Sequence, residues 1–198
     1  TIYNTGYQRC IGGHSWGPGI RDYYLMHLVT SGKGIFTVND TSFEISEGDA
    51  FIIKPNTLVS YVADENDPWE YYWVGFNGAD ASRLVELTSF EQDNPILKFS
   101  EQETALIKKS LLNIYSNFGT TAEQEIMTVS RLFEVFSLII KFSPKKREDS
   151  SLARNYIKDA VKFIARNFSD NIDVEDIANH VGLSRSHLYR IFMKHLFL

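Results

Sequence analysis

Residues 173–195 read DVEDIANHVGLSRSHLYRIFMKH and predict two short helices joined by a tight turn. Asp173 is placed to cap the first helix and Ser184 to cap the second. Gly182 allows the positive φ of a sharp turn between them. Ala178 is small enough for the second helix to cross the first closely. A small residue, a glycine four positions later and a leucine six positions after that match the spacing of a helix-turn-helix unit.

The second of these helices is expected to present a polar, basic face that contacts DNA. The residues on this face are Arg185, Ser186, His187, Arg190 and Lys194. An arginine near the start of such a helix can pair with guanine edges in the major groove, whereas Arg190 and Lys194 suit phosphate contacts. The alternative interpretation is a face that only water contacts.

Composition describes an ordinary globular protein of one large domain or two modest ones. The 198 residues are 43% hydrophobic and 23% charged, with a net charge of −5. Residues 1–142 carry 10 Lys and Arg against 18 Asp and Glu, whereas residues 143–198 carry 10 against 7. This uneven charge suggests two modules with different partners, and it argues against nonspecific nucleic-acid binding by the whole surface.

The expected location is the cytoplasm, with no membrane partner. The single cysteine, Cys10, cannot form an internal disulfide, which fits a reducing compartment. No apolar run approaches the roughly 20 residues of a membrane span, and the first residues do not resemble a signal peptide.

The front of the chain predicts many short strands rich in aromatic residues. They are expected at residues 24–29, 35–38, 43–45, 50–53, 59–62 and 69–76, with turns at Gly32, Asn39-Asp40 and Gly48. Short, evenly spaced strands indicate a small antiparallel barrel or a sandwich, and the barrel is favoured.

A helical period begins at Ser100, which forms a capping box with Glu103, and Thr121 with Gln124 opens a second helix. The second helix has a wide apolar stripe, which either meets a second subunit or is covered by the first helix. Residues 143–150 contain a proline and no apolar residue, and therefore predict a linker. A further helix is expected from about residue 152 to residue 167.

Residues 177–192, together with 13–21, 31–34, 48–53 and 69–73, resemble the AraC family of bacterial regulators, especially its regulators of raffinose and multiple-sugar utilisation. The resemblance implies an α+β protein of two domains. It places a cupin-like, sugar-binding antiparallel β-barrel at 1–98 and two dimerisation helices at 99–142. After the linker at 143–150, it places part of an all-α DNA-binding domain at 151–198.

The resemblance also implies a function. It indicates a transcription regulator of a carbohydrate operon that senses a sugar, for example an α-galactoside. Operator DNA, a second copy of the chain and RNA polymerase are the implied partners, and no cofactor is expected.

The chain departs from the family pattern after Leu196, where a second helix-turn-helix unit normally follows. Phe197 and Leu198 end the chain instead, so a sensing and dimerising fragment that cannot bind an operator alone is an open alternative. The missing initiator methionine favours a trimmed chain.

Sugars are held by aromatic faces and by planar polar groups. Tyr71 and Trp73 share one strand face with Trp69, because they alternate with the residues between them. By resemblance, Tyr61, Tyr71 and Trp73 line the sugar pocket. Arg21 is the expected charged anchor, with His14 and Trp16 supplied by an N-terminal arm that sugar binding would order over the barrel. The alternative is that these aromatic residues are plain core.

A cupin-type enzyme is a further alternative, but the sequence gives it little support. A metal site needs two histidines and a carboxylate at ligand spacing, yet the barrel region offers only His14 and His27, far apart in sequence. His27 is expected to be a core histidine with satisfied hydrogen bonds. No catalytic or metal-binding residue is therefore predicted.

Overall fold

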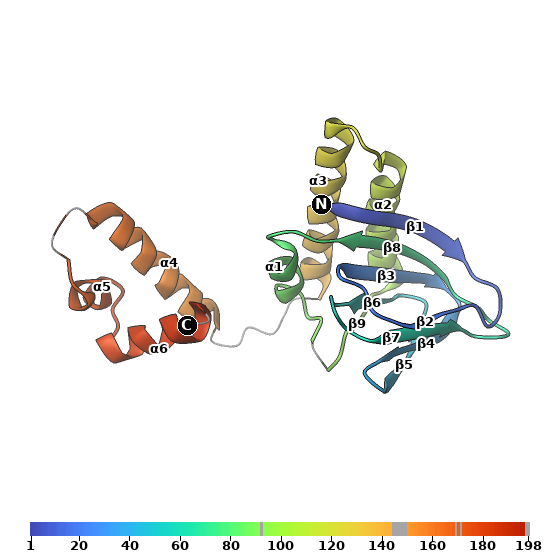
Figure 1. Ribbon diagram of the computed structural model, residues 1–198, viewed down its shortest axis with the longest axis horizontal. Helices are drawn as coiled ribbons and strands as arrows, with labels where there is room; N and C mark the ends of the chain where they lie inside the picture. Colours follow the sequence, from blue (N-terminus) through green and yellow to red (C-terminus); the bar gives the residue numbers. More distant parts are fainter. Residues whose placement is uncertain (92, 144–149, 169, 171, 197–198) are drawn as a thin grey trace. The chain divides into compact units, whose positions relative to one another are not determined.

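The structure, a computed structural model, describes residues 1–91, 93–143, 150–168, 170 and 172–196. The chain forms two compact units, Thr1–Lys145 and Lys146–Leu198, and each is described by itself (Figure 1). Most of the predicted linker, residues 144–149, lies outside the described residues.

The described part of the first unit contains nine strands and three helices. They are β1 (Ile2–Arg9), β2 (Ser15–Gly19), β3 (Tyr24–Ser31), β4 (Lys33–Val38), β5 (Thr41–Ser46), β6 (Asp49–Ile53), β7 (Val59–Ala63), β8 (Glu70–Phe76), α1 (Ala81–Glu86), β9 (Ile96–Lys98), α2 (Glu101–Asn117) and α3 (Ala122–Phe142). The second unit contains α4 (Ser150–Asn167), α5 (Val174–His180) and α6 (Arg185–Leu196).

The strands form two antiparallel sheets, which confirms the predicted cupin-like β-domain. One sheet has the order β1-β8-β3-β6-β9 and the other the order β2-β7-β4-β5. Hydrogen bonding between the described strands does not close them into one continuous barrel. The predicted hairpin at Asn39-Asp40 joins β4 to β5, and both of its residues have positive φ, as a tight type I′ turn requires.

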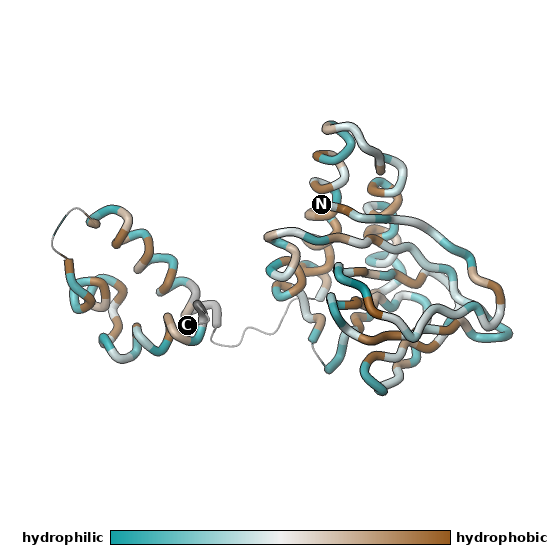
Figure 2. Tube along the Cα trace, in the orientation of Figure 1, coloured by the Kyte–Doolittle hydropathy of each residue, from teal (hydrophilic) through white to brown (hydrophobic). Residues whose placement is uncertain are grey.

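The five-stranded sheet is covered on both faces because its side chains alternate between two apolar cores. On β3, Met26 and Leu28 point toward α2 and α3, whereas Leu25 and Val29 point toward the four-stranded sheet. Figure 2 colours the chain by hydropathy and shows brown, hydrophobic stretches within this unit. A sheet buried on both faces needs near-continuous apolar strands, and β6 is buried at all five of its positions.

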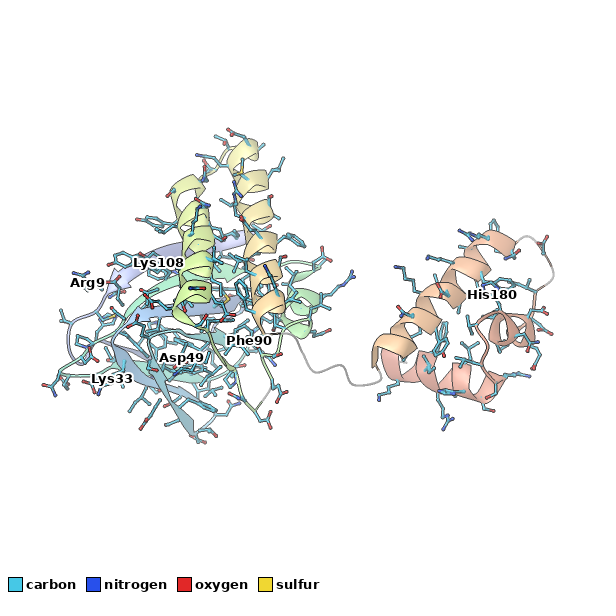
Figure 3. All side chains as sticks on the ribbon, turned by 180° about the vertical axis from the view of Figure 1, so that it is seen from behind. Arg9, Lys33, Asp49, Phe90, Lys108 and His180 are labelled. Carbon is cyan, nitrogen blue, oxygen red and sulfur yellow. The ribbon has the colours of Figure 1, made fainter. Side chains whose placement is uncertain are left out.

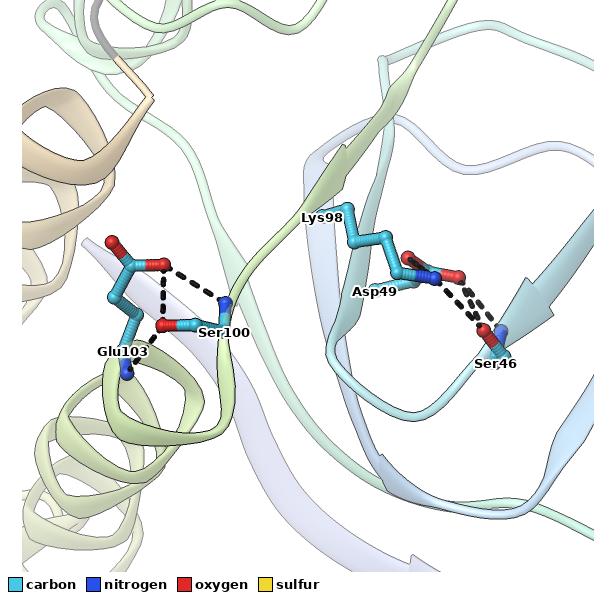
Figure 4. Close-up of polar contacts among 5 residues, drawn as sticks. All are labelled: Ser46, Asp49, Lys98, Ser100 and Glu103. Atoms are coloured by element: carbon cyan, nitrogen blue, oxygen red, sulfur yellow. Dashed lines mark hydrogen bonds and ion pairs between the residues drawn. The ribbon is translucent and has the colours of Figure 1, made fainter.

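Two helices pack on the outer face of this sheet and lie next to each other in Figure 1. Both predicted capping boxes are present, at Ser100 with Glu103 and at Thr121 with Gln124. Figure 4 shows the first of them, and beside it the buried Asp49 carboxylate. This carboxylate accepts hydrogen bonds from the backbone N–H (2.8 Å) and the hydroxyl (3.1 Å) of Ser46. These bonds fix the turn that leads into β6.

The edge of the same outer face carries charged residues that pack on tyrosine. The ammonium group of Lys108 on α2 lies 5.1 Å from the centre of the Tyr72 ring on β8. Arg9 on β1 pairs with Glu70 at 2.8 Å. Figure 3 shows Arg9 and Lys108 on this side of the unit.

The second unit has the predicted helix-turn-helix arrangement of α5, a turn at Gly182 and α6. Asp173 caps α5 through a capping box with Asp176, and Gly182 has a φ of 70°. The small core consists of Ala160, Ala178 and Leu188, with four partly buried apolar residues packed around them. None of the helices in the described ranges has both the length and the apolar character that a membrane crossing requires.

Replacing Ala178 with leucine is expected to unfold the second unit while leaving the first intact. Ala178 has no exposed surface, and its carbonyl accepts the backbone N–H of Leu183, so a larger side chain separates α5 from α6. Such overpacking costs about 1–3 kcal/mol. Far-UV circular dichroism reports the helices, and tryptophan fluorescence reports the first unit, which holds all three tryptophans. The control is Asn179→Leu, which adds the same side chain at an exposed position. If the two variants have the same melting temperature, the close packing of α5 against α6 at Ala178 is contradicted.

Candidate ligand site and nucleic-acid interface

A connected row of aromatic rings crosses the space between the two sheets. The Trp16 ring on β2 stacks on Tyr61 of β7 with 5.6 Å between ring centres. Tyr61 lies edge-on to Tyr71 at 6.4 Å, and Tyr71 lies edge-on to Trp73 at 5.8 Å. Tyr71 and Trp73 share the inner face of β8, as predicted, whereas Tyr72 packs on the helix side. The structure therefore brings four of the predicted ligand residues into contact.

Glycines make room for two of these tryptophans. Gly6 on β1 lies opposite Trp73 on β8, and a Cβ on Gly6 would overlap the Trp73 indole. A Cβ on Gly19 would lie 2.7 Å from the Trp16 ring. Each indole thus occupies space that a side chain at the glycine position would fill. Trp73 is further held by donating its Nε1–H to Oδ1 of Asn4, at 3.1 Å.

Arg21 lies at the Trp16 end of the row, as the predicted charged anchor. Its Cζ atom is 3.6 Å from the centre of the Trp16 ring, a cation–π contact. Its Nε is buried and has no hydrogen-bond partner among the described residues. Burial raises the pKa of Tyr61, and the charge and hydrogen bond of Arg21 partly offset that rise. The guanidinium is therefore positioned to donate to a further oxygen atom.

Gln8 connects His14 to the aromatic row, and the sequence analysis did not identify it. Its Nε2 donates to Nε2 of His14 at 3.1 Å, and its Oε1 accepts the Tyr71 hydroxyl at 3.4 Å. The alternation of β1 places Gln8 on the same face as Gly6. No sequence signal marked this residue, because β1 itself was not predicted.

The residues expected in an N-terminal arm lie in the sheets or directly beside them, Trp16 in β2 and His14 just before it. β1 pairs with β8 from Ile2↔Phe76 to Arg9↔Glu70, and Trp16 on β2 lies opposite Tyr61. The carbonyl of His14 accepts the backbone N–H of Ala63, at 2.9 Å.

His27 agrees with the sequence-based expectation in its burial but not in its hydrogen bonding. It is a core residue, as expected, with 1% of its surface exposed. Its Nδ1, however, is buried and has no hydrogen-bond partner within the part of the chain that the structure describes, which contradicts the expectation of a satisfied histidine. Burial, together with the positive charge of Arg21, lowers the pKa of His27 from 6.5 to about 3. The ring is therefore neutral at physiological pH.

The described residues contain no group of three or more histidines, cysteines and carboxylates that could hold a metal ion. The interior between the sheets thus presents aromatic faces, hydroxyls, an amide, a neutral imidazole and a guanidinium. This set suits hydrogen bonding and stacking.

The second candidate site is the exposed face of α6. Leu188 packs in one core with Ala160 of α4 and Ala178 of α5, and Ile191 is also buried. The five predicted DNA-facing residues, Arg185, Ser186, His187, Arg190 and Lys194, are all exposed. The helix begins after Ser184, whose hydroxyl accepts the backbone N–H of His187 at 3.3 Å. This face thus combines three cationic side chains, a hydroxyl and an imidazole with a fixed helix start.

Two family profiles match the chain. Residues 2–136 match the AraC-like ligand binding domain, and residues 164–196 match the bacterial regulatory helix-turn-helix proteins of the AraC family. The first match lies within the first unit and the second within the second unit.

Three curated relatives span most of the chain. The Msm operon regulatory protein of Streptococcus mutans is 31% identical, over 98% of this chain and 70% of its own length. The lactose operon transcription activator of Staphylococcus xylosus is 29% identical, over 87% of this chain and 62% of its own length. The raffinose operon transcriptional regulatory protein RafR of Pediococcus pentosaceus is 24% identical, over 96% and 70%.

Proposed function

The chain belongs to the AraC family of bacterial regulators, and from that membership we propose that it controls a carbohydrate-utilisation operon in response to a bound sugar. All three curated relatives carry the names of operon regulators, and two of these names specify a sugar operon, lactose or raffinose. The observation that carries the proposal is the aromatic row between the sheets, ending at an arginine whose Nε has no partner.

The chemistry of this row fits a sugar better than an apolar ligand. Aromatic faces pack against the C–H patches of a sugar ring, and planar polar groups bind its hydroxyls. Trp16 and Trp73 are half-buried and offer the faces, while Arg21, Tyr61, Tyr71 and His14 offer the polar groups. Arg21 covers one face of Trp16 in the structure, so its guanidinium would lie next to a sugar bound at this end of the row. An α-galactoside such as raffinose or melibiose is the proposed effector.

Raffinose or melibiose is expected to raise the melting temperature of the wild-type chain, because a ligand that binds only the folded state stabilises it. At a sugar concentration about 100-fold above Kd, the gain is about 2.7 kcal/mol. Differential scanning fluorimetry with raffinose, melibiose, lactose, sucrose and glucose measures the shift. Trp73→Ala is expected to abolish it.

The matched control is Tyr3→Ala, which removes an exposed aromatic residue on β1. If every sugar leaves the melting temperature unchanged while an unrelated metabolite raises it, the sugar assignment is wrong.

We also propose that α6 binds the major groove of operator DNA. Arg185 at the start of the helix reads base edges together with Ser186 and His187, and Arg190 and Lys194 hold phosphates. Exposure of all five side chains on a helix that follows a tight turn supports this assignment.

Arg185→Ala is expected to weaken binding to a preferred duplex about tenfold, because a bidentate base contact is worth about 1–3 kcal/mol. The duplex is one that the wild-type chain enriches from random-sequence DNA, and titrations at one fixed salt concentration give both Kd values. The control, Lys158→Ala, removes the same charge from an exposed position on α4. Enrichment of no sequence at all would favour the alternative of a chain that senses sugar without reading DNA.

A homodimer through α2 and α3 is the third part of the proposal. Each helix buries one side against the sheet and still exposes large apolar side chains elsewhere. The exposed ones are Leu106, Leu112, Tyr115, Phe118, Ile126, Met127 and Phe133. Mutual covering of the two helices therefore leaves part of their apolar surface in water, and a second copy would cover it.

Ile126→Glu is expected to weaken self-association at least about tenfold, because Ile126 is 73% exposed and a charge there would be buried at the interface. Sedimentation equilibrium gives the dimer constant. Thr41→Glu, which adds the same charge on β5, is the control and should leave association unchanged. A monomeric wild-type chain at high concentration would contradict the proposal.

A further inference from the structure

We propose that His27 is a ligand-contacting residue of this site, whose Nδ1 hydrogen-bonds a hydroxyl of an uncharged sugar next to Arg21. This inference rests on the sugar-sensing function proposed above and names a contact that neither the sequence analysis nor the aromatic row alone supplied. The carrying observation is a polar ring at the centre of the inner face with an unpaired nitrogen.

His27 lies in the middle of the five-stranded sheet. On one side β8 places Trp73 directly opposite it, and on the other side β6 places Phe51 opposite it. These three residues therefore share the inner face. The strand register alone places His27 next to Trp73, one of the residues proposed to stack on the sugar. The alternation of β3 leaves no freedom to turn the ring toward the helices.

The ring is enclosed by aromatic side chains that offer its Nδ1 no partner. It stacks on Phe51 at 4.5 Å between ring centres and lies edge-on to Tyr61 and Tyr71, at 5.4 and 5.0 Å. Buried polar atoms in folded proteins nearly always have a hydrogen-bond partner, because an unpaired one destabilises the fold. An apolar residue would fill this position at less cost, so the imidazole has a use beyond packing.

The charge state of the ring indicates the kind of ligand group it takes. With its pKa lowered to about 3, His27 is neutral, with one ring nitrogen as donor and the other as acceptor. A hydroxyl group pairs with Nδ1 in either tautomer, since it can donate or accept. Arg21, whose charge acts on His27, then donates its unpaired Nε–H to a second oxygen of the same ligand. Two such oxygens close together are what a sugar presents.

Access to His27 is through the strand that covers Tyr61. β2 pairs with β7 alone, and its register is interrupted between Trp16 and Gly19. It is therefore held by fewer backbone hydrogen bonds than the central strands. Outward movement of β2 carries Trp16 off Tyr61 and opens a path to the His27 ring that lies against it.

The test compares the sugar affinity and the stability of two His27 variants, with raffinose as the probe and calorimetric titration as the measurement. His27→Leu keeps a similar volume and removes both ring nitrogens. It is expected to weaken raffinose binding at least about tenfold while leaving the melting temperature equal or higher. His27→Asn keeps a polar atom near the Nδ1 position and is expected to restore most of the affinity.

The matched control is Thr104→Val. Thr104 on α2 also buries an unpaired atom, its Oγ1, but it lies on the helix side of the sheet. This variant is expected to gain stability in the same way and to bind raffinose as the wild type does.

His27→Leu binding raffinose with unchanged affinity would overturn the inference and leave the sugar proposal standing. Loss of affinity in His27→Leu with a lower melting temperature and no rescue by Asn would also overturn it, since the role would then be structural. If the wild type binds a different metabolite and no sugar, the proposed function fails, and the same three variants titrated with that metabolite still decide the role of His27.

Discussion

The burial of the five-stranded sheet on both faces is the constraint on which the rest of the first unit depends. One face packs on α2 and α3 and the other on the four-stranded sheet, so every strand must alternate between two apolar environments. A buried polar residue in such a strand cannot hydrogen-bond to water and needs a hydrogen-bond partner in the interior. Among the described residues, the Nδ1 of His27 on β3 lacks one, and so does the Nε of Arg21, which lies between β2 and β3. The proposed ligand supplies what the fold leaves unpaired.

The same alternation gives the unit a direct means of coupling its two faces. On β3, His27 faces the proposed ligand while Met26 and Leu28, its immediate neighbours, pack toward the helices. On β8, Tyr71 and Trp73 face inward, and Tyr72 between them contacts Lys108 of α2. A ligand that shifts either strand therefore acts on the proposed dimer helices through adjacent residues. The proposed ligand site and the proposed dimer surface would both act on the same packed strands, β3 and β8, which is the physical requirement for allosteric coupling.

The sequence predicted those parts of the fold whose signals are local. The capping boxes at Ser100 and Thr121, the hairpin at Asn39-Asp40 and the helix-turn-helix around Gly182 each depend on a few residues at fixed spacing, and all are confirmed. β1, β2 and β9 were not predicted, because β1 is polar at many positions, β2 contains Gly17 and Pro18, and β9 has three residues. These strands form through pairing with distant partners. The contacts of Gln8 and His27 depend on that pairing, so no local pattern could identify them.

Hydrogen exchange of the backbone amides, with and without a saturating sugar, tests the central claim most directly. Sugar is expected to slow exchange in β3 and β8 at the positions around His27 and Trp73. It is also expected to change exchange in α2, which packs on the other side of these strands. Protection confined to β2 and β7, with β3 and α2 unchanged, would show that the ligand binds on the four-stranded sheet alone. It would contradict both the contact with His27 and the coupling through the five-stranded sheet.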